Sequence, residues 1–63
     1  RRFTTVDTPF GPVRIKHKLC DGQALGAMPE YDDCRKLADE HRVPVRVVYD
    51  AALRANFLQK MNT

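Results

Sequence analysis

The sequence predicts an α+β fold, in which a small antiparallel sheet of two to three strands, opened by an N-terminal hairpin, carries two C-terminal helices on one face. Apolar and basic residues alternate over residues 13–18, apolar residues recur at helical spacing over 31–41, and Pro44 separates this stretch from a second apolar one. A chain of 63 residues suits one small domain, which buries only about 60% of its unfolded surface.

The first expected element is a β-hairpin. Residues 3–8 are rich in Thr, Val and Phe, and residues 8–11 read Thr-Pro-Phe-Gly, which supplies turn residues. In the second strand a period of two separates two sets of side chains onto opposite faces. The apolar face carries Val13, Ile15 and His17, and the basic face carries Arg14, Lys16 and Lys18.

A third strand is expected over residues 23–28, after the turn Cys20-Asp21-Gly22, although Gly26 interrupts it. Either this third strand or the packing of a helix on the hairpin is required, because an isolated two-stranded hairpin is only marginally stable in water.

Two helices should follow. Pro29 suits the first position of the first helix, where its missing N–H costs nothing. Pro44 ends that helix and can start the second one. The predicted buried residues are Tyr31, Cys34, Leu37, Ala38 and His41 in the first helix, and Val45, Val48, Tyr49, Ala52, Leu53 and Phe57 in the second. Residues 59–63 should fray.

Charge is unevenly distributed along the chain. Residues 1–18 carry five basic side chains and one acidic one, whereas residues 19–33 carry four acidic side chains and no basic one. Such segregation is a weak indication of an anionic partner for the first segment, and from charge alone a solvated charged face is the better explanation.

Several functions are disfavoured. The chain has no serine, no P-loop and no Gly-x-Gly-x-x-Gly motif, so no catalytic residue is predicted. No apolar run approaches the roughly 18 residues of a membrane span. The cysteine and histidine spacings of zinc sites are absent. Cys34 and His41 would lie about 10 Å apart along one helix, too far to bind the same ion. The roles of His17 and Cys20 stay open.

The helix pair has the length and apolar spacing of a helix-turn-helix. However, its turn lacks the frequent glycine, and the first helix carries acids that would repel a phosphate backbone. These acids are Glu30, Asp32, Asp33, Asp39 and Glu40. Nucleic-acid binding is therefore the disfavoured alternative.

The basic strand face is the better candidate site. Arg14, Lys16 and Lys18 should project at roughly 6.6–6.8 Å spacing, which suits a polyphosphate. The acidic cluster offers Glu30 and Asp33 to a hard divalent cation that accompanies the phosphates. Edge-strand charges that prevent aggregation are an equally good explanation of the basic face.

Two motifs carry a family resemblance. "VDTPFGPVRIK" followed by "PEYDDCRKLADEHRVPVRVVYDAAL" resembles the end of LarC-type nickel insertion proteins, over residues 3–54. Arg14 and Lys16 match that family's V-R-x-K pattern, and Glu30, Tyr31 and Asp33 match its P-E-Y-x-D pattern. Helix capping and packing are the alternative role of these last three residues. Arg42 stands where the family more often has glycine before Val-Pro.

The resemblance implies a cytoplasmic, CTP-dependent nickel chelatase, a lyase-type enzyme. The full-length protein would insert nickel, its substrate metal, into a pyridinium bisthiocarboxylate mononucleotide, which completes the nickel-pincer cofactor of lactate racemase. CTP, with Mg²⁺ or Mn²⁺, would be cleaved to CMP and pyrophosphate, and homo-oligomers are expected. On this interpretation residues 1–63 are a C-terminal fragment, and the alternative is a non-catalytic oligomerisation or packing module of the same protein.

Overall fold

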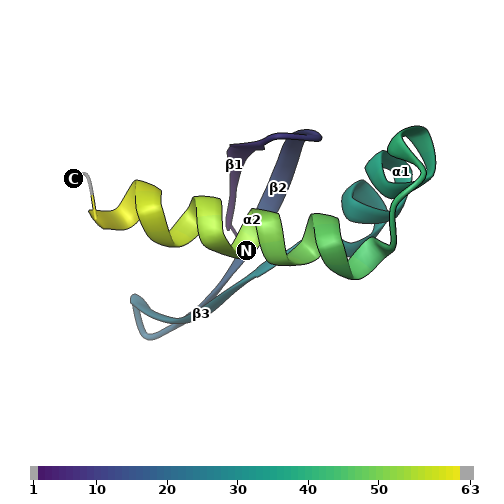
Figure 1. Ribbon diagram of the computed structural model, residues 1–63. Coiled ribbons are helices and arrows are strands. Elements are labelled where there is room, and N and C mark those ends of the chain that lie inside the picture. The colour runs from purple at the N-terminus through teal and green to yellow at the C-terminus, as the bar shows by residue number, and fades with distance from the viewer. Residues whose placement is uncertain (1, 62–63) are drawn as a thin grey trace.

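The computed structural model describes residues 2–61, apart from the side chains of residues 20, 23–25 and 60. Three strands are followed by two helices (Figure 1): β1 (Arg2–Thr8), β2 (Gly11–Cys20), β3 (Gln23–Pro29), α1 (Tyr31–His41) and α2 (Val45–Met61). The predicted α+β class, with an N-terminal hairpin and a third strand, is confirmed.

The sheet is a simple antiparallel meander in the order β1-β2-β3. Val6 of β1 lies opposite Val13 of β2, and Lys16 lies opposite both Phe3 and Met28. The register between β2 and β3 shifts at Lys18/Leu19. Because opposite residues share a face, this register determines which side chains surround the basic row of β2.

The turn between β1 and β2 is fixed by Thr8. Its Oγ1 donates to the Gly11 carbonyl oxygen at 2.7 Å and accepts the Phe10 and Gly11 backbone N–H groups at 3.1 Å each. Gly11 has φ +135°, and a Cβ there would lie 3.0 Å from Cδ2 of Leu37. The backbone conformation therefore favours glycine at this turn, and any larger residue would also require the Leu37 side chain to shift.

The core lies between one sheet face and the helices. Helix α2 crosses over the strands, while α1 lies beside the end of the sheet that holds the β1–β2 turn (Figure 1). The buried cluster is formed by Val6, Val13, Ile15, Cys34, Leu37, Ala38, Val48 and Ala52. The predicted alternation of β2 is confirmed for Val13 and Ile15, both fully buried.

The start of α1 differs from the prediction. Pro29 is the last residue of β3, opposite Ile15, and is not in the helix. Glu30 is the extended N-cap residue, and its backbone N–H donates to the Arg14 carbonyl oxygen at 2.8 Å. A proline at a strand end is tolerated for the same reason as at a helix start, since neither position needs its N–H.

Four predicted core residues of the helices are exposed, and Val45 and Tyr49 are only partly buried. Tyr31 is 57% exposed, Leu53 40% and Phe57 61%, and His41 is also exposed. A helix of 17 residues is about 25 Å long, whereas three strands about 4.8 Å apart span only about 10 Å between the outer axes. The second half of α2 therefore extends past the sheet that its first half covers.

Two further predictions concern the ends and the environment of the chain. Helix α2 continues to Met61, and residues 62–63 lie outside the described residues, so fraying of residues 59–63 stays a prediction. Within residues 2–61, neither helix has the length and hydropathy that a membrane span requires.

Candidate functional site: a basic sheet face

The basic row of β2 lies on the sheet face opposite the core. Because Val13 and Ile15 point into the core, the alternate residues Arg14, Lys16 and Lys18 point to the other face. Arg14 and Lys18 are exposed and Lys16 is half-buried. The structure therefore brings all three predicted phosphate ligands to one surface, hereafter the outer face.

A cleft of about 380 Å³ lies on this face at the two lysines. Lys16, Lys18, Gly26 and Met28 line this lysine cleft. Nothing lies within 4 Å of the position a Gly26 Cβ would take, so the glycine leaves the space between the strands open. The cleft volume falls in the range of small-ligand sites, about 300–1,000 Å³.

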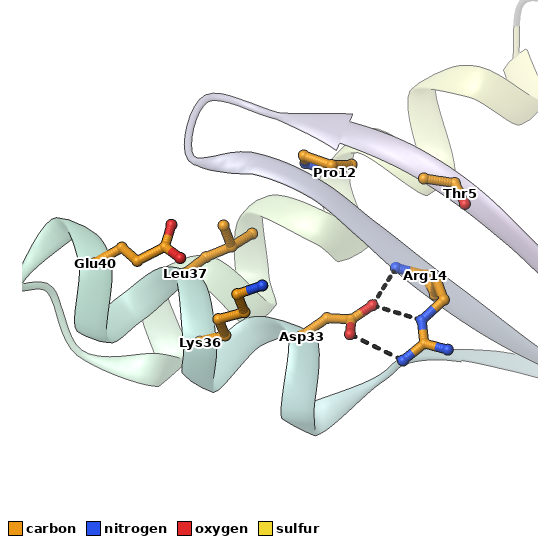
Figure 2. Close-up of a pocket in the computed structure, with 7 residues that line it drawn as sticks. All are labelled: Thr5, Pro12, Arg14, Asp33, Lys36, Leu37 and Glu40. Atoms are coloured by element: carbon orange, nitrogen blue, oxygen red, sulfur yellow. Dashed lines mark hydrogen bonds and ion pairs between the residues drawn. The ribbon is translucent and has the colours of Figure 1, made fainter.

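Arg14 is engaged by Asp33 of α1. Its Nε lies 2.9 Å from Asp33 Oδ2 and its Nη2 lies 3.0 Å from Oδ1, a two-pronged ion pair. The Arg14 backbone N–H also donates to Oδ2 at 3.0 Å. Figure 2 shows all three contacts converging on one carboxylate.

The position of Asp33 follows from where β3 leaves the sheet. The Arg14 backbone faces the β3 side of β2, and its carbonyl oxygen accepts the Glu30 N–H. Beyond Glu30 the chain turns into α1, so the Arg14 N–H has no strand partner there. The Asp33 carboxylate supplies the acceptor instead, which continues the strand ladder with a side chain and joins α1 to β2.

The ion pair changes the electrostatics of both groups. The hydrogen bond from the Arg14 side chain, helped by the Arg14 backbone N–H and charge, holds the pKa of Asp33 below its ordinary value. The same hydrogen bond raises the pKa of Arg14. Both groups are therefore charged at neutral pH.

A second cleft, of about 400 Å³, opens beside this pair. Figure 2 shows Thr5, Pro12 and Arg14 on the strand side and four residues of α1 on the other. Those α1 residues are Asp33, Lys36, Leu37 and Glu40. Its lining carries charges of both signs, so it suits a polyphosphate less well than the lysine cleft does.

The predicted cation ligands are Glu30 and Asp33. Both oxygens of Asp33 accept hydrogen bonds from Arg14, so a cation there would compete with the guanidinium. The Glu30 side chain makes no cap hydrogen bond. Within the described residues no group of three or more His, Cys, Asp or Glu side chains is placed to hold a metal. The pair stays a prediction.

The remaining soft ligands are dispersed. His17 Nε2 lies 2.8 Å from Thr4 Oγ1, and His41 Nε2 lies 2.9 Å from the Phe10 carbonyl oxygen. Cys34 is a free thiol in the core, where burial raises its pKa. The Cys20 side chain lies outside the described residues.

Sequence reasoning missed two residues of the outer face, Phe3 and Met28, which flank Lys16 on either side. They are 46% and 61% exposed. A signal for Phe3 was present: a two-residue turn at Pro9-Phe10 places residues whose numbers sum to 19 opposite one another. The β3 partner depends on a shifted register, which no sequence pattern indicates.

Comparison with known proteins identifies relatives. The nickel insertion protein family matches residues 1–49. A pyridinium-3,5-bisthiocarboxylic acid mononucleotide nickel insertion protein of Lactiplantibacillus plantarum is 46% identical over 56 residues, which are 87% of this chain and 13% of that protein. The protein of the same description from Thermotoga petrophila is 33% identical over 54 residues, 86% of this chain and 14% of that protein.

A solved structure has the same fold. It is the apo form of the C-terminal domain of a cyclometallase involved in synthesis of the NPN cofactor of lactate racemase. The TM-score is 0.80 at 45% identity, over 87% of this chain and 38% of that one. This chain thus spans about one seventh of the length of the curated relatives and less than half of that domain.

Proposed function

This chain belongs to the nickel insertion protein family, and we propose that it is part of a longer enzyme that inserts nickel into pyridinium-3,5-bisthiocarboxylic acid mononucleotide. The relatives of that description support the substrate, and the cyclometallase domain supports a role in making the cofactor of lactate racemase. The proposed reaction is a lyase-type nickel insertion that depends on CTP. It takes place in the cytoplasm, where thiols such as Cys34 stay reduced.

The part assigned to residues 1–63 is contact with the phosphates of CTP. The observation that carries it is the row of Arg14, Lys16 and Lys18 on the outer face, with an open cleft at the two lysines. Ammonium groups at this spacing can each bind a different phosphate. Arg14 joins the two lysines by exchanging its hydrogen bond to one Asp33 oxygen for a hydrogen bond to a phosphate oxygen. A phosphate can reach it because its side chain is 54% exposed.

The cation that accompanies CTP, Mg²⁺ or Mn²⁺, is assigned to Glu30 and Asp33. Carboxylate oxygens are the ligands that such hard cations prefer. When Arg14 turns to a phosphate, the Asp33 carboxylate becomes available beside the Glu30 side chain, which has no cap hydrogen bond.

We expect a titration of the 63-residue chain with CTP, followed by amide NMR, to shift signals of residues 13–18. Replacing Lys16 and Lys18 together with Glu should weaken CTP binding by at least about tenfold, because two attractive charges become repulsive. The matched control is the pair Arg35→Glu and Arg46→Glu, which makes the same change in net charge at exposed helix positions. With Mn²⁺ present, paramagnetic broadening should reach the signals of Glu30 and Asp33.

If both double variants bind CTP equally weakly, the effect is due to net charge alone, which would contradict a site at the lysines. An absence of shifts at millimolar CTP, from a folded sample, would contradict nucleotide binding by this part of the protein. Shifts without Mn²⁺ broadening at residues 30–33 would reject the cation assignment alone.

The second candidate is a packing or homo-oligomerisation module without nucleotide contact. The observation that favours it is the exposed apolar stripe of α2, where Leu53, Phe57 and Met61 follow one another at four-residue spacing. Sedimentation of the wild-type chain and of the lysine variant, with and without CTP, separates the two candidates. The second candidate is supported if the wild-type chain self-associates and CTP has no effect on either chain.

A further inference from the structure

The outer face carries one aromatic side chain among its charges. Phe3 is the only aromatic residue in the three strands and is 46% exposed. It lies on β1, directly opposite Lys16, whereas the lysine cleft lies on the β3 side of Lys16. A phenyl ring left open to solvent beside cationic groups is a surface on which a planar ring can stack.

Arg14 is held at the same ring. Its Cζ lies 5.9 Å from the centroid of Phe3, within cation–π range. The two hydrogen bonds from its side chain to Asp33 restrict where the guanidinium can lie. Asp33 in α1, Arg14 in β2 and Phe3 in β1 thus form a chain of contacts that orients one end of the outer face.

The order of groups along this face matches the order of groups in a nucleotide. The aromatic ring of Phe3 comes first, Lys16 is its direct partner, and Lys18 lies one strand repeat of roughly 6.6–6.8 Å further along. A nucleoside triphosphate likewise has a planar base at one end and an anionic phosphate chain at the other. Lys16 borders both the ring and the lysine cleft, so it can bridge the two ends.

A strand of nucleic acid fits this face less well than a single nucleotide. Binding of single strands relies on several aromatic side chains on which successive bases stack, and the strands here contain only Phe3. On the Arg14 side the neighbouring cleft carries Asp33 and Glu40 as well as Arg14 and Lys36, so no continuous basic surface follows there for a phosphate backbone.

We infer that the pyrimidine base of the bound nucleotide stacks on Phe3 while its phosphates occupy the lysine cleft. This rests on the proposed function and adds to it the residue that recognises the base.

The test uses the absence of tryptophan from the chain. Phe3→Trp places the sole tryptophan at the proposed base site, and Phe57→Trp places it on α2, at a phenylalanine that is 61% exposed. We expect CTP to quench the fluorescence of the first variant and not of the second. Inorganic tripolyphosphate, which has no base, should bind without comparable quenching.

A variant that lacks the ring measures how much stacking contributes to the affinity for CTP. Phe3→Leu should weaken CTP binding by about tenfold, since stacking of one base contributes a factor of this order, and should leave tripolyphosphate binding unchanged. Phe57→Leu is the matched control and should change neither affinity. Amide spectra of each variant show whether the fold is retained.

Three results would overturn the inference. CTP affinity unchanged by Phe3→Leu, with shifts still at Lys16 and Lys18, rejects the base site and keeps the proposed phosphate site. Failure of both CTP and tripolyphosphate to bind the wild-type chain rejects the two together. Tighter binding of an oligo-deoxycytidine than of CTP would identify the face as a nucleic-acid site.

Discussion

At the residue scale, Arg42 shows what a side chain costs at a left-handed helix end. Arg42 ends α1 in the left-handed conformation, with φ 55° and ψ 46°, and its backbone N–H donates to the Ala38 carbonyl oxygen. Glycine adopts this conformation without steric cost, whereas a residue with a side chain adopts it only at a cost in free energy. The turn therefore forms here with an arginine at a position whose backbone conformation favours glycine.

Arg42→Gly should accordingly stabilise the chain by about 0.5–1 kcal/mol, because relief of the left-handed strain exceeds the entropy that glycine adds to the unfolded state. Urea unfolding at pH 7 measures the change. Arg46→Gly, within helix α2, is the control and should destabilise by a similar amount. A loss of stability in Arg42→Gly would show that the strain at this cap is negligible.

At the scale of elements, the contact between α1 and β2 depends on Asp33 as well as on apolar packing. Leu37 packs against Gly11 at the turn, while the Asp33 carboxylate accepts hydrogen bonds from the backbone N–H and the guanidinium of Arg14. The first contact fixes the distance of α1 from the sheet, and the second completes the ladder where β3 ends. A charged side chain here performs a structural task, whereas sequence reasoning offered it cation binding or, as the alternative, helix capping and packing.

This predicts a pH dependence. The pKa of Asp33 is lowered in the fold, so its contribution to the free energy of unfolding is complete well above the ordinary value of about 3.9. The contribution declines as the pH falls through that value and is lost below the folded-state pKa.

We therefore expect Asp33→Asn to be less stable than wild type at pH 7, by on the order of 1 kcal/mol, and the difference to shrink by pH 3. Urea unfolding at both pH values measures it. Asp32→Asn, which removes the adjacent exposed carboxylate, is the matched control. A difference between wild type and Asp33→Asn that is the same at both pH values would contradict the ion pair.

At the scale of the whole molecule, a single small core holds the fold. Eight side chains form the buried cluster, and nine large apolar residues in the described chain are exposed. A core of this size rarely contributes more than about 3–5 kcal/mol of net stability. Leu53, Phe57 and Met61 lie in the second half of α2, which extends past the sheet, and they are the surface that the second candidate function would use.

Ile15→Ala should therefore leave much of the chain unfolded at 25 °C. Ile15 is fully buried at the centre of β2, and such a truncation costs about 2–5 kcal/mol, comparable with the whole stability. Thermal unfolding by circular dichroism measures this, with Val47→Ala as the control at a residue that is 42% exposed. A cooperative transition near the wild-type temperature would mean that other packing holds the fold.

The sequence alone determined the elements, because each has a local cause. Alternation over residues 13–18 specified the two faces of β2, the helical period specified Cys34, Leu37 and Ala38 as buried, and Pro44 separated the helices. The basic row was predictable for the same reason, since neighbours two residues apart in a strand share a face whatever surrounds them.

Only the tertiary structure decided what depends on where elements end and meet. The width of the sheet left Leu53 and Phe57 exposed, although their spacing fits a buried stripe. The exit of β3 at Pro29 brought Asp33 to Arg14, and the strand register placed Phe3 and Met28 beside Lys16. These are contacts between residues far apart in the chain, and no local period encodes them.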